Sequence, residues 1–116
     1  METVTIPASW HGDPRFYELW KRMGEIHSKK NHDYAGIEDA LRNFRECEQI
    51  GIPAWKGAFV RFQDKYRRLV TFVKQEAFEV GDESFEDTCI DGANYLLLVA
   101  VLFEEAKEAE KRTLKS

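Results

Sequence analysis

Residues 95–103 read YLLLVAVLF, nine apolar residues in a row, and this stretch decides the fold. We expect a helix here that begins at a motif resembling a capping box, Ser84-x-x-Asp87, and runs to about Lys111. Lysine and arginine near that end suit the negative pole of a helix. A helix that is apolar on nearly every side has to be covered on every side, so the stretch predicts a helical bundle.

Three further helices are expected upstream of this one. Asp13-Pro14 is a typical helix start, with Asp as the cap and Pro at the first helical position. Gly51 suits a helix stop. The expected helices cover residues 14–30, residues 37 or 40 to 50, and a segment that follows Pro53 and ends near residue 78. Four helices with short connections predict an all-α fold, a small four-helix bundle.

The length of 116 residues fits one ordinary domain, and 43% hydrophobic residues are enough for a core. We expect an irregular N-terminal arm over residues 1–12 and a single helical domain over residues 13–112. Three partner helices from so short a chain do not fully cover residues 95–103, so we also expect a homo-oligomer.

Charge and cysteine content argue against several classes of protein. The formal charge of −4 argues against direct nucleic-acid binding, which normally needs a strongly basic face. Two cysteines without CxxC spacing are typical of reduced thiols in a cytoplasmic protein. No stretch approaches the roughly 20 apolar residues of a membrane span, and the N-terminus does not read as a signal peptide. We therefore expect a cytoplasmic protein without membrane contact.

A column of acidic side chains precedes the apolar stretch. Glu83, Asp87 and Asp91 follow one another at intervals of four residues, which places them along one face of a helix. Carboxylates in such a column are suitable ligands for a divalent cation, here Mg²⁺. The alternative for Glu83 and Asp87 is that they only complement the positive pole of the helix. Asp91 lies two turns in, beside Gly92, and is the stronger candidate for a functional role.

A basic face is expected on the preceding helix, where Arg61, Lys65 and Arg68 share one side with Asp64. Guanidinium and ammonium groups are the usual partners of phosphate. The alternative is internal salt bridging, in which these cations neutralise the acids of the last helix. The two interpretations are compatible, since one face can serve both purposes in the free and the bound protein.

A third set of candidates comes from polar and aromatic residues near the expected helix ends. Lys30 and Asp33 stand beside Tyr34, whose ring is suited to stacking on a base. An ordinary surface loop is the alternative for this segment. The residues expected to line the base or the sugar are Tyr34, Asn43, Asn94 and Tyr95.

Taken together, these motifs resemble a known family. The motifs are Lys30-x-x-Asp33-Tyr34, Asn43-Phe44, Arg61-x-x-Asp64-Lys65-x-x-Arg68 and Asp82-Glu83-Ser84-x-x-Asp87-Thr88-x-x-Asp91-x-x-x-Tyr95. Over roughly residues 25–103 the chain resembles the nucleotide modification-associated domain family, which is common in bacteriophages and prophages. The resemblance implies a helical protein of nucleotide or modified-base metabolism, located in a bacterial host.

More distantly, the layout is similar to the MazG-like all-α nucleoside triphosphate pyrophosphohydrolases. That similarity implies Mg²⁺ held by helix-borne acids and cleavage between the α- and β-phosphates. Asp87-x-x-x-Asp91 fits the second half of the acidic pattern of these enzymes. Glu76-x-x-Glu79 has the spacing of the first half, but it lies too close in sequence to Asp87 to sit one helix away.

The expected function is therefore Mg²⁺-dependent hydrolysis of a nucleoside triphosphate. Asp87 and Asp91 are the expected catalytic residues, and with Glu83 they are the expected metal ligands. The expected substrate-binding residues are Lys30, Asp33, Tyr34, Asn43, Arg61, Lys65, Arg68, Asn94 and Tyr95. Two alternatives stay open: a non-catalytic protein that sequesters a nucleotide, and a purely structural or interaction bundle.

Overall fold

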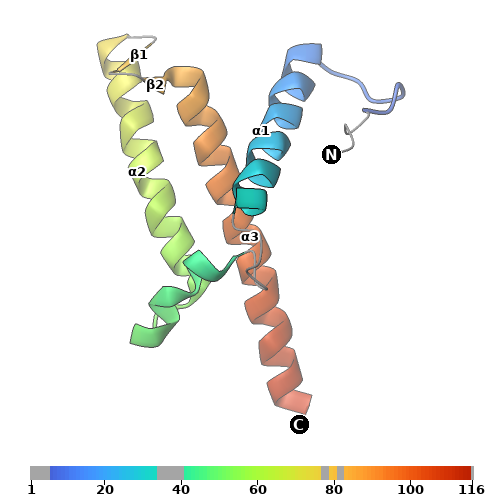
Figure 1. Cartoon of the computed structure of the whole chain (residues 1–116), viewed down its shortest axis with the longest axis vertical. Coiled ribbons are helices and arrows are strands. Elements are labelled where there is room, and N and C mark those ends of the chain that lie inside the picture. The colour runs from blue at the N-terminus through green and yellow to red at the C-terminus, as the bar shows by residue number, and fades with distance from the viewer. Residues whose placement is uncertain (1–5, 34–40, 77–78, 81–82, 116) are drawn as a thin grey trace. The chain divides into compact units, whose positions relative to one another are not determined.

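The computed structural model describes residues 6–33, 41–76, 79–80 and 83–115. They belong to two compact units, Met1–Gly36 and Ile37–Ser116, which are described separately. The all-α prediction is confirmed (Figure 1). Boundaries of the elements are α1 Pro14–Asp33, η1 Arg42–Phe44, η2 Glu46–Ile50, α2 Ala54–Gln75, β1 Glu79–Val80, β2 Glu83–Ser84 and α3 Phe85–Lys115. The single domain expected over residues 13–112 stays a prediction.

The first unit consists of helix α1 and the segment before it, whose residues 6–12 contain neither helix nor strand. Helix α1 starts at the predicted place, because the Asp13 carboxylate accepts a hydrogen bond from the Arg15 amide at 2.8 Å. The ring of Trp10 packs against Tyr17 and Trp20, with centroids 5.7 and 6.1 Å apart. The segment before the helix is therefore held by aromatic contacts.

The second unit is built on the helical hairpin of α2 and α3 (Figure 1). Strands β1 and β2 pair antiparallel between the two helices, with Glu79 opposite Ser84. Helix α2 ends at Gln75, and its C-cap residue Glu76 has a left-handed backbone (φ 51°). At the other side of the turn, the Ser84 hydroxyl accepts a hydrogen bond from the Asp87 amide at 3.0 Å. The predicted Ser84 cap is thus confirmed.

The helix expected between residue 37 or 40 and residue 50 is corrected to two short 3₁₀ helices, η1 and η2, within residues 42–50. Leu41, Phe44 and Cys47 recur every third residue, and a 3₁₀ helix with three residues per turn places them on one side. Leu41 and Phe44 pack against the core, and Cys47 lies against Gly57. The predicted stop at Gly51 is confirmed by its left-handed conformation (φ 81°).

The core of the second unit is small. Ala54, Ala58 and Leu102 form its buried cluster, and the partly buried hydrophobic residues packed on it are Leu41, Phe44, Trp55 and Val99. At the hairpin end of the helices, the Phe72 ring meets Phe85 with centroids 5.7 Å apart. Small side chains at residues 54 and 58 allow α3 and the 3₁₀ segment to approach α2 closely.

None of the helices within the described residues is long and apolar enough to cross a membrane.

Candidate functional site

Helices α2 and α3 approach each other closely at Gly92, which is buried. A Cβ atom at this position would lie 3.6 Å from the Phe62 ring and 3.8 Å from the Lys65 Cβ, which is ordinary van der Waals contact. The stem of Lys65 therefore runs along the backbone of α3. This contact brings the basic side chain of α2 to the acidic residue that precedes Gly92.

That acidic residue is Asp91, and its Oδ2 lies 3.6 Å from the Lys65 Nζ. The two side chains are only 15% exposed for Lys65 and 28% exposed for Asp91. A partly buried carboxylate is costly unless a cation accompanies it, and Lys65 supplies that charge. The pair agrees with the internal salt bridging expected from sequence. It also places an ammonium group, which can bind phosphate, beside a carboxylate, which can bind a metal ion.

Asp87 lies one turn before Asp91 on α3 and is half-buried. Its amide is part of the Ser84 cap, so its position on the first turn of the helix is fixed. Below it, the fully buried Thr88 hydroxyl donates a hydrogen bond to the Ser84 carbonyl at 3.1 Å. The two carboxylates thus stand on the first and second turns of α3, next to the hydrogen bonds of Ser84.

The third predicted metal ligand, Glu83, belongs to β2, where its backbone pairs with Val80. Its side chain lies outside the described residues. In the described parts of the chain, no group of three or more His, Cys, Asp or Glu side chains is arranged to hold a metal ion. The metal site therefore stays a prediction.

A stack of three side chains lies next along the hairpin. The Arg61 guanidinium lies over the Phe44 ring at 4.8 Å from its centroid, and Phe44 meets Tyr95 edge to face at 6.2 Å. The 3₁₀ segment thereby brings residues 43–44, Arg61 and Tyr95 into one neighbourhood. Sequence reasoning assigned Asn43, Arg61 and Tyr95 to the site but placed Phe44, the ring between Arg61 and Tyr95, only on the buried side of a helix.

Arg68 and Asp64 form an ion pair of 3.3 Å one turn apart on α2, and both are about half exposed. Asn94 lies one turn after Asp91 and is half-buried, whereas Asn43 on η1 is exposed. The structure thus gives Arg68 an acidic neighbour on its own helix.

The remaining predicted site residues do not belong to the described part of this unit. Lys30 is exposed near the end of α1, in the first unit. The side chain of Asp33 and the whole of Tyr34 lie outside the described residues. Their assignment to the site stays a prediction.

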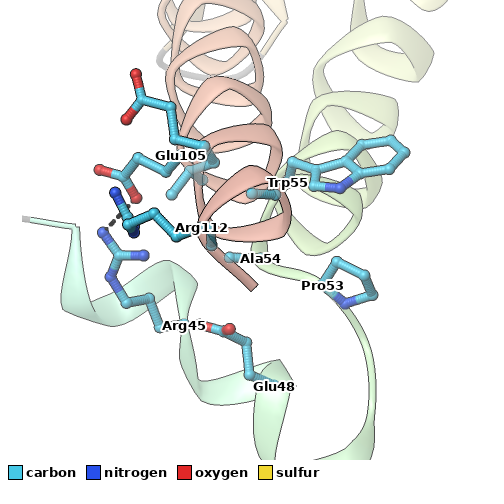
Figure 2. A pocket seen from close by; sticks show the side chains of 11 residues that line it. Arg45, Glu48, Pro53, Ala54, Trp55, Glu105 and Arg112 are labelled. Atoms are coloured by element: carbon cyan, nitrogen blue, oxygen red, sulfur yellow. Dashed lines mark hydrogen bonds and ion pairs between the residues drawn. The ribbon is translucent and has the colours of Figure 1, made fainter. Parts of the chain in front are cut away.

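A pocket of about 420 Å³ lies at the far end of the hairpin, where the 3₁₀ segment meets α3 (Figure 2). Its most prominent contact is the ion pair between the Arg45 Nη2 and the Glu105 Oε2, 2.7 Å apart. Glu48 and Arg112 add further charges of both signs. None of the site residues predicted from sequence lines this pocket. Arg45 and Glu105 are 60 residues apart in sequence, so no local spacing predicts that they pair.

In comparisons with known proteins, no family model, no curated protein and no solved structure matches the chain.

Proposed function

We propose that this protein binds a nucleotide through Mg²⁺ and acts as a MazG-like nucleoside triphosphate pyrophosphohydrolase in phage nucleotide metabolism. The observation that carries the proposal is the Lys65–Asp91 pair, in which a half-buried acid is kept beside a basic side chain at a helix crossing. Under this proposal the protein works in the cytoplasm of a bacterial host.

The carboxylates of α3 suit a Mg²⁺ ion whose other ligands are phosphate oxygens and waters. Asp87 and Asp91 offer hard carboxylate oxygens one turn apart, with Glu83 as the predicted third ligand. Mg²⁺ is usually bound by one or two carboxylates while phosphate oxygens and waters complete its coordination. When bound with a substrate, the ion would neutralise phosphate charge and activate a water molecule. Two described carboxylates are therefore sufficient for a metal that arrives with its nucleotide.

The cations of α2 would serve the phosphates. Lys65 neutralises Asp91 in the free protein, and its ammonium would be available to a phosphate oxygen if Asp91 held another cation. Arg61 lies one turn before Lys65 and Arg68 lies nearly one turn after it, so the three form a basic edge along the helix. In the reaction, water attacks the α-phosphate, the bond to the bridging oxygen breaks, and pyrophosphate leaves.

The base and sugar would meet the polar and aromatic side chains around the stack. Tyr95 and the exposed Asn43 flank Phe44, and Asn94 lies beside Tyr95 on α3. Lys30, Asp33 and Tyr34 complete the proposed ligand set from the N-terminal segment.

The experiment that tests the proposal combines stability with product analysis. The full chain is heated with a panel of nucleoside triphosphates, with and without Mg²⁺, and the products and any retained ligand are identified by mass spectrometry. We expect protection against unfolding that requires Mg²⁺, together with a nucleoside monophosphate and pyrophosphate. Asp91→Asn should abolish both effects, while the exposed control Glu104→Gln should leave them unchanged. Full turnover by Asp91→Asn would refute the assignment.

Sequestration of a nucleotide without hydrolysis is the second candidate function. It is favoured by Lys65, which already neutralises Asp91 and leaves the acid without need of a metal. In the same experiment, a retained nucleotide without product and without Mg²⁺ dependence distinguishes capture from catalysis.

We further propose that the protein is a homo-oligomer, since α3 exposes large apolar side chains on more than one side.

A further inference from the structure

The Lys65 side chain is held by its root at the crossing of α2 and α3. A Cβ atom at Gly92 would lie 3.8 Å from the Lys65 Cβ, so the first carbon of this side chain lies against the α3 backbone. At the other end of the side chain, the Lys65 Nζ lies 3.6 Å from the Asp91 Oδ2. The ammonium can therefore leave Asp91 only by turning the chain beyond Cβ, because Cβ itself is fixed at the crossing.

The contact between these two charges is of a kind that can exchange. At 3.6 Å the nitrogen and the oxygen attract each other as charges but are too far apart for a good hydrogen bond. The Arg45–Glu105 pair of the same unit, at 2.7 Å, has the closer geometry of a charge-assisted hydrogen bond. Lys65 thus neutralises Asp91 without a short hydrogen bond that would have to be broken.

Lys65 differs in its partner from the other two cations of the basic edge. Arg68 pairs with an acid of its own helix at 3.3 Å, and Arg61 lies over the Phe44 ring at 4.8 Å. Lys65 instead faces Asp91 on α3, one of the two carboxylates proposed to bind Mg²⁺. A cation proposed to bind phosphate and an acid proposed to bind a metal ion therefore occupy each other in the free protein.

This mutual occupation makes each ligand costly to bind when it comes alone. The ammonium would be repelled by Mg²⁺ at Asp91, and an ammonium that is mostly withdrawn from water is costly without a partner. A phosphate at Lys65 would likewise leave the Asp91 carboxylate without its cation and beside a second negative charge. When Mg²⁺ and a polyphosphate arrive together, both side chains keep a partner of opposite charge, so neither cost remains.

We propose that the Lys65–Asp91 pair disfavours Mg²⁺ alone and polyphosphate alone, and admits the two together as one complex. The inference rests on the proposed function and deepens it, because it names the magnesium–polyphosphate complex as the form of substrate that the site takes. Coupling between two ligands is reciprocal. Removal of the Lys65 charge should therefore favour Mg²⁺ alone, and removal of the Asp91 charge should favour polyphosphate alone.

The first test measures the binding of Mg²⁺ alone by titration calorimetry at constant ionic strength. We expect Lys65→Met to bind Mg²⁺ about tenfold more tightly than the wild type, and we expect this gain to vanish when Asp91→Asn is added. Arg67→Met is the matched control, since it removes one positive charge from an exposed position of the same helix. It should change the affinity by less than about twofold. A Lys65→Met variant that binds Mg²⁺ no more tightly than Arg67→Met would overturn the proposal.

The second test measures the binding of inorganic triphosphate alone, with a chelator present to remove divalent metal ions. It decides the case if Lys65→Met fails to fold. We expect Asp91→Asn to bind triphosphate about tenfold more tightly than the wild type, because the Lys65 ammonium is then released for the anion. Glu104→Gln is the matched control, since it removes one negative charge from an exposed position of the same helix. Equal affinities of Asp91→Asn and Glu104→Gln for triphosphate would overturn the proposal.

The two tests separate this inference from the proposed function. If the wild type hydrolyses a nucleotide with Mg²⁺ but neither variant gains affinity for its single ion, the proposed function stands and the inference is wrong. If both variants gain affinity but the wild type neither binds nor hydrolyses a nucleotide, the proposed function is wrong, while the Lys65–Asp91 pair still disfavours each ion alone.

Discussion

The Lys65 ammonium lies 3.6 Å from the Asp91 carboxylate, where α2 and α3 cross, and both side chains are mostly withdrawn from water. A cation on one helix and an acid on the other therefore meet at the point where Gly92 lets the backbones come together. This relationship links the stability of the hairpin to the proposed chemistry, because the groups that would serve a ligand also hold the free protein together.

Removing one partner of the Lys65–Asp91 pair should lower the free energy of unfolding more than removing one partner of a surface ion pair does. Lys65→Met leaves the Asp91 charge partly buried without compensation, so we expect a loss of about 1–3 kcal/mol in the free energy of unfolding. The control Lys107→Met, in the exposed pair with Glu104, should cost less than about 0.5 kcal/mol. Urea denaturation followed by circular dichroism measures both. Equal losses for the two variants would show that the crossing pair is no stronger than a surface contact.

Gly57 should resist substitution for a steric reason. A Cβ at this position would lie 2.7 Å from the Cys47 Sγ, so in Gly57→Ala either the Cys47 thiol has to rotate away or the 3₁₀ segment has to shift. We expect a loss of about 1 kcal/mol despite the better helix propensity of alanine. Beyond its own helix backbone, none of the described residues comes within 4 Å of a Cβ placed at Gly24 in α1, so Gly24→Ala should be neutral or stabilising by up to about 1 kcal/mol.

A double-mutant cycle identifies the atom responsible at Gly57. If the Cys47 Sγ is the obstacle, Gly57→Ala should cost less in a Cys47→Ala background than in the wild type. A cost that is the same in both backgrounds would assign the effect to the helix backbone.

Cys89 should react slowly near neutral pH although it is exposed. Partial burial raises the pKa of its thiol, and the nearby Glu86 carboxylate raises this pKa further. The thiolate is the nucleophile, so its fraction below the raised pKa is smaller than for a free thiol. We expect alkylation by iodoacetamide to accelerate with rising pH and to be faster at neutral pH in Glu86→Gln than in the control Glu110→Gln. Mass spectrometry of the modified peptide measures the rate for Cys89 separately from Cys47.

The start of α1 should loosen in acid. The Arg15 side chain and amide both hydrogen-bond to Asp13 and hold the pKa of its carboxyl below the usual value. A carboxyl with a lowered pKa stabilises the folded form above its unfolded pKa, and this contribution is lost as pH falls through the lowered value. We expect hydrogen exchange of the Arg15 amide to become faster, relative to the rest of α1, as the pH falls through the lowered pKa of Asp13. Asp13→Asn keeps a cap oxygen and should remove the pH dependence, while Asp13→Ala should fray the helix at every pH.

Several features of the fold could be read from local sequence. The Asp13-Pro14 start, the Gly51 stop and the Ser84 cap were predicted correctly because each depends on a few neighbouring residues and on backbone conformation. The segment at residues 42–50 was predicted as one helix because its apolar residues are compatible with either helical period. Packing on Ala58 and Gly57 selects the three-residue period instead.

The candidate site was predictable only as a set of residue types. Spacing placed Arg61, Lys65 and Arg68 on one side of a helix, but it did not tell which of them meets an acid of α3. The structure pairs Lys65 with Asp91, Arg68 with Asp64, and Arg61 with the Phe44 ring. Predictions for Glu83, Asp33 and Tyr34 concern side chains outside the described residues.

By itself, the sequence determined that the protein is all-α, that helices begin after Asp13 and Ser84, and that a helical segment stops at Gly51. These properties follow from caps, periodicity and hydrophobicity, which act within a few residues along the chain. The tertiary structure decided which helix faces meet, because a crossing depends on the shapes of side chains far apart in sequence. Gly92 lies against Phe62 and Lys65, and Arg45 reaches Glu105 across 60 residues, contacts that no local pattern encodes.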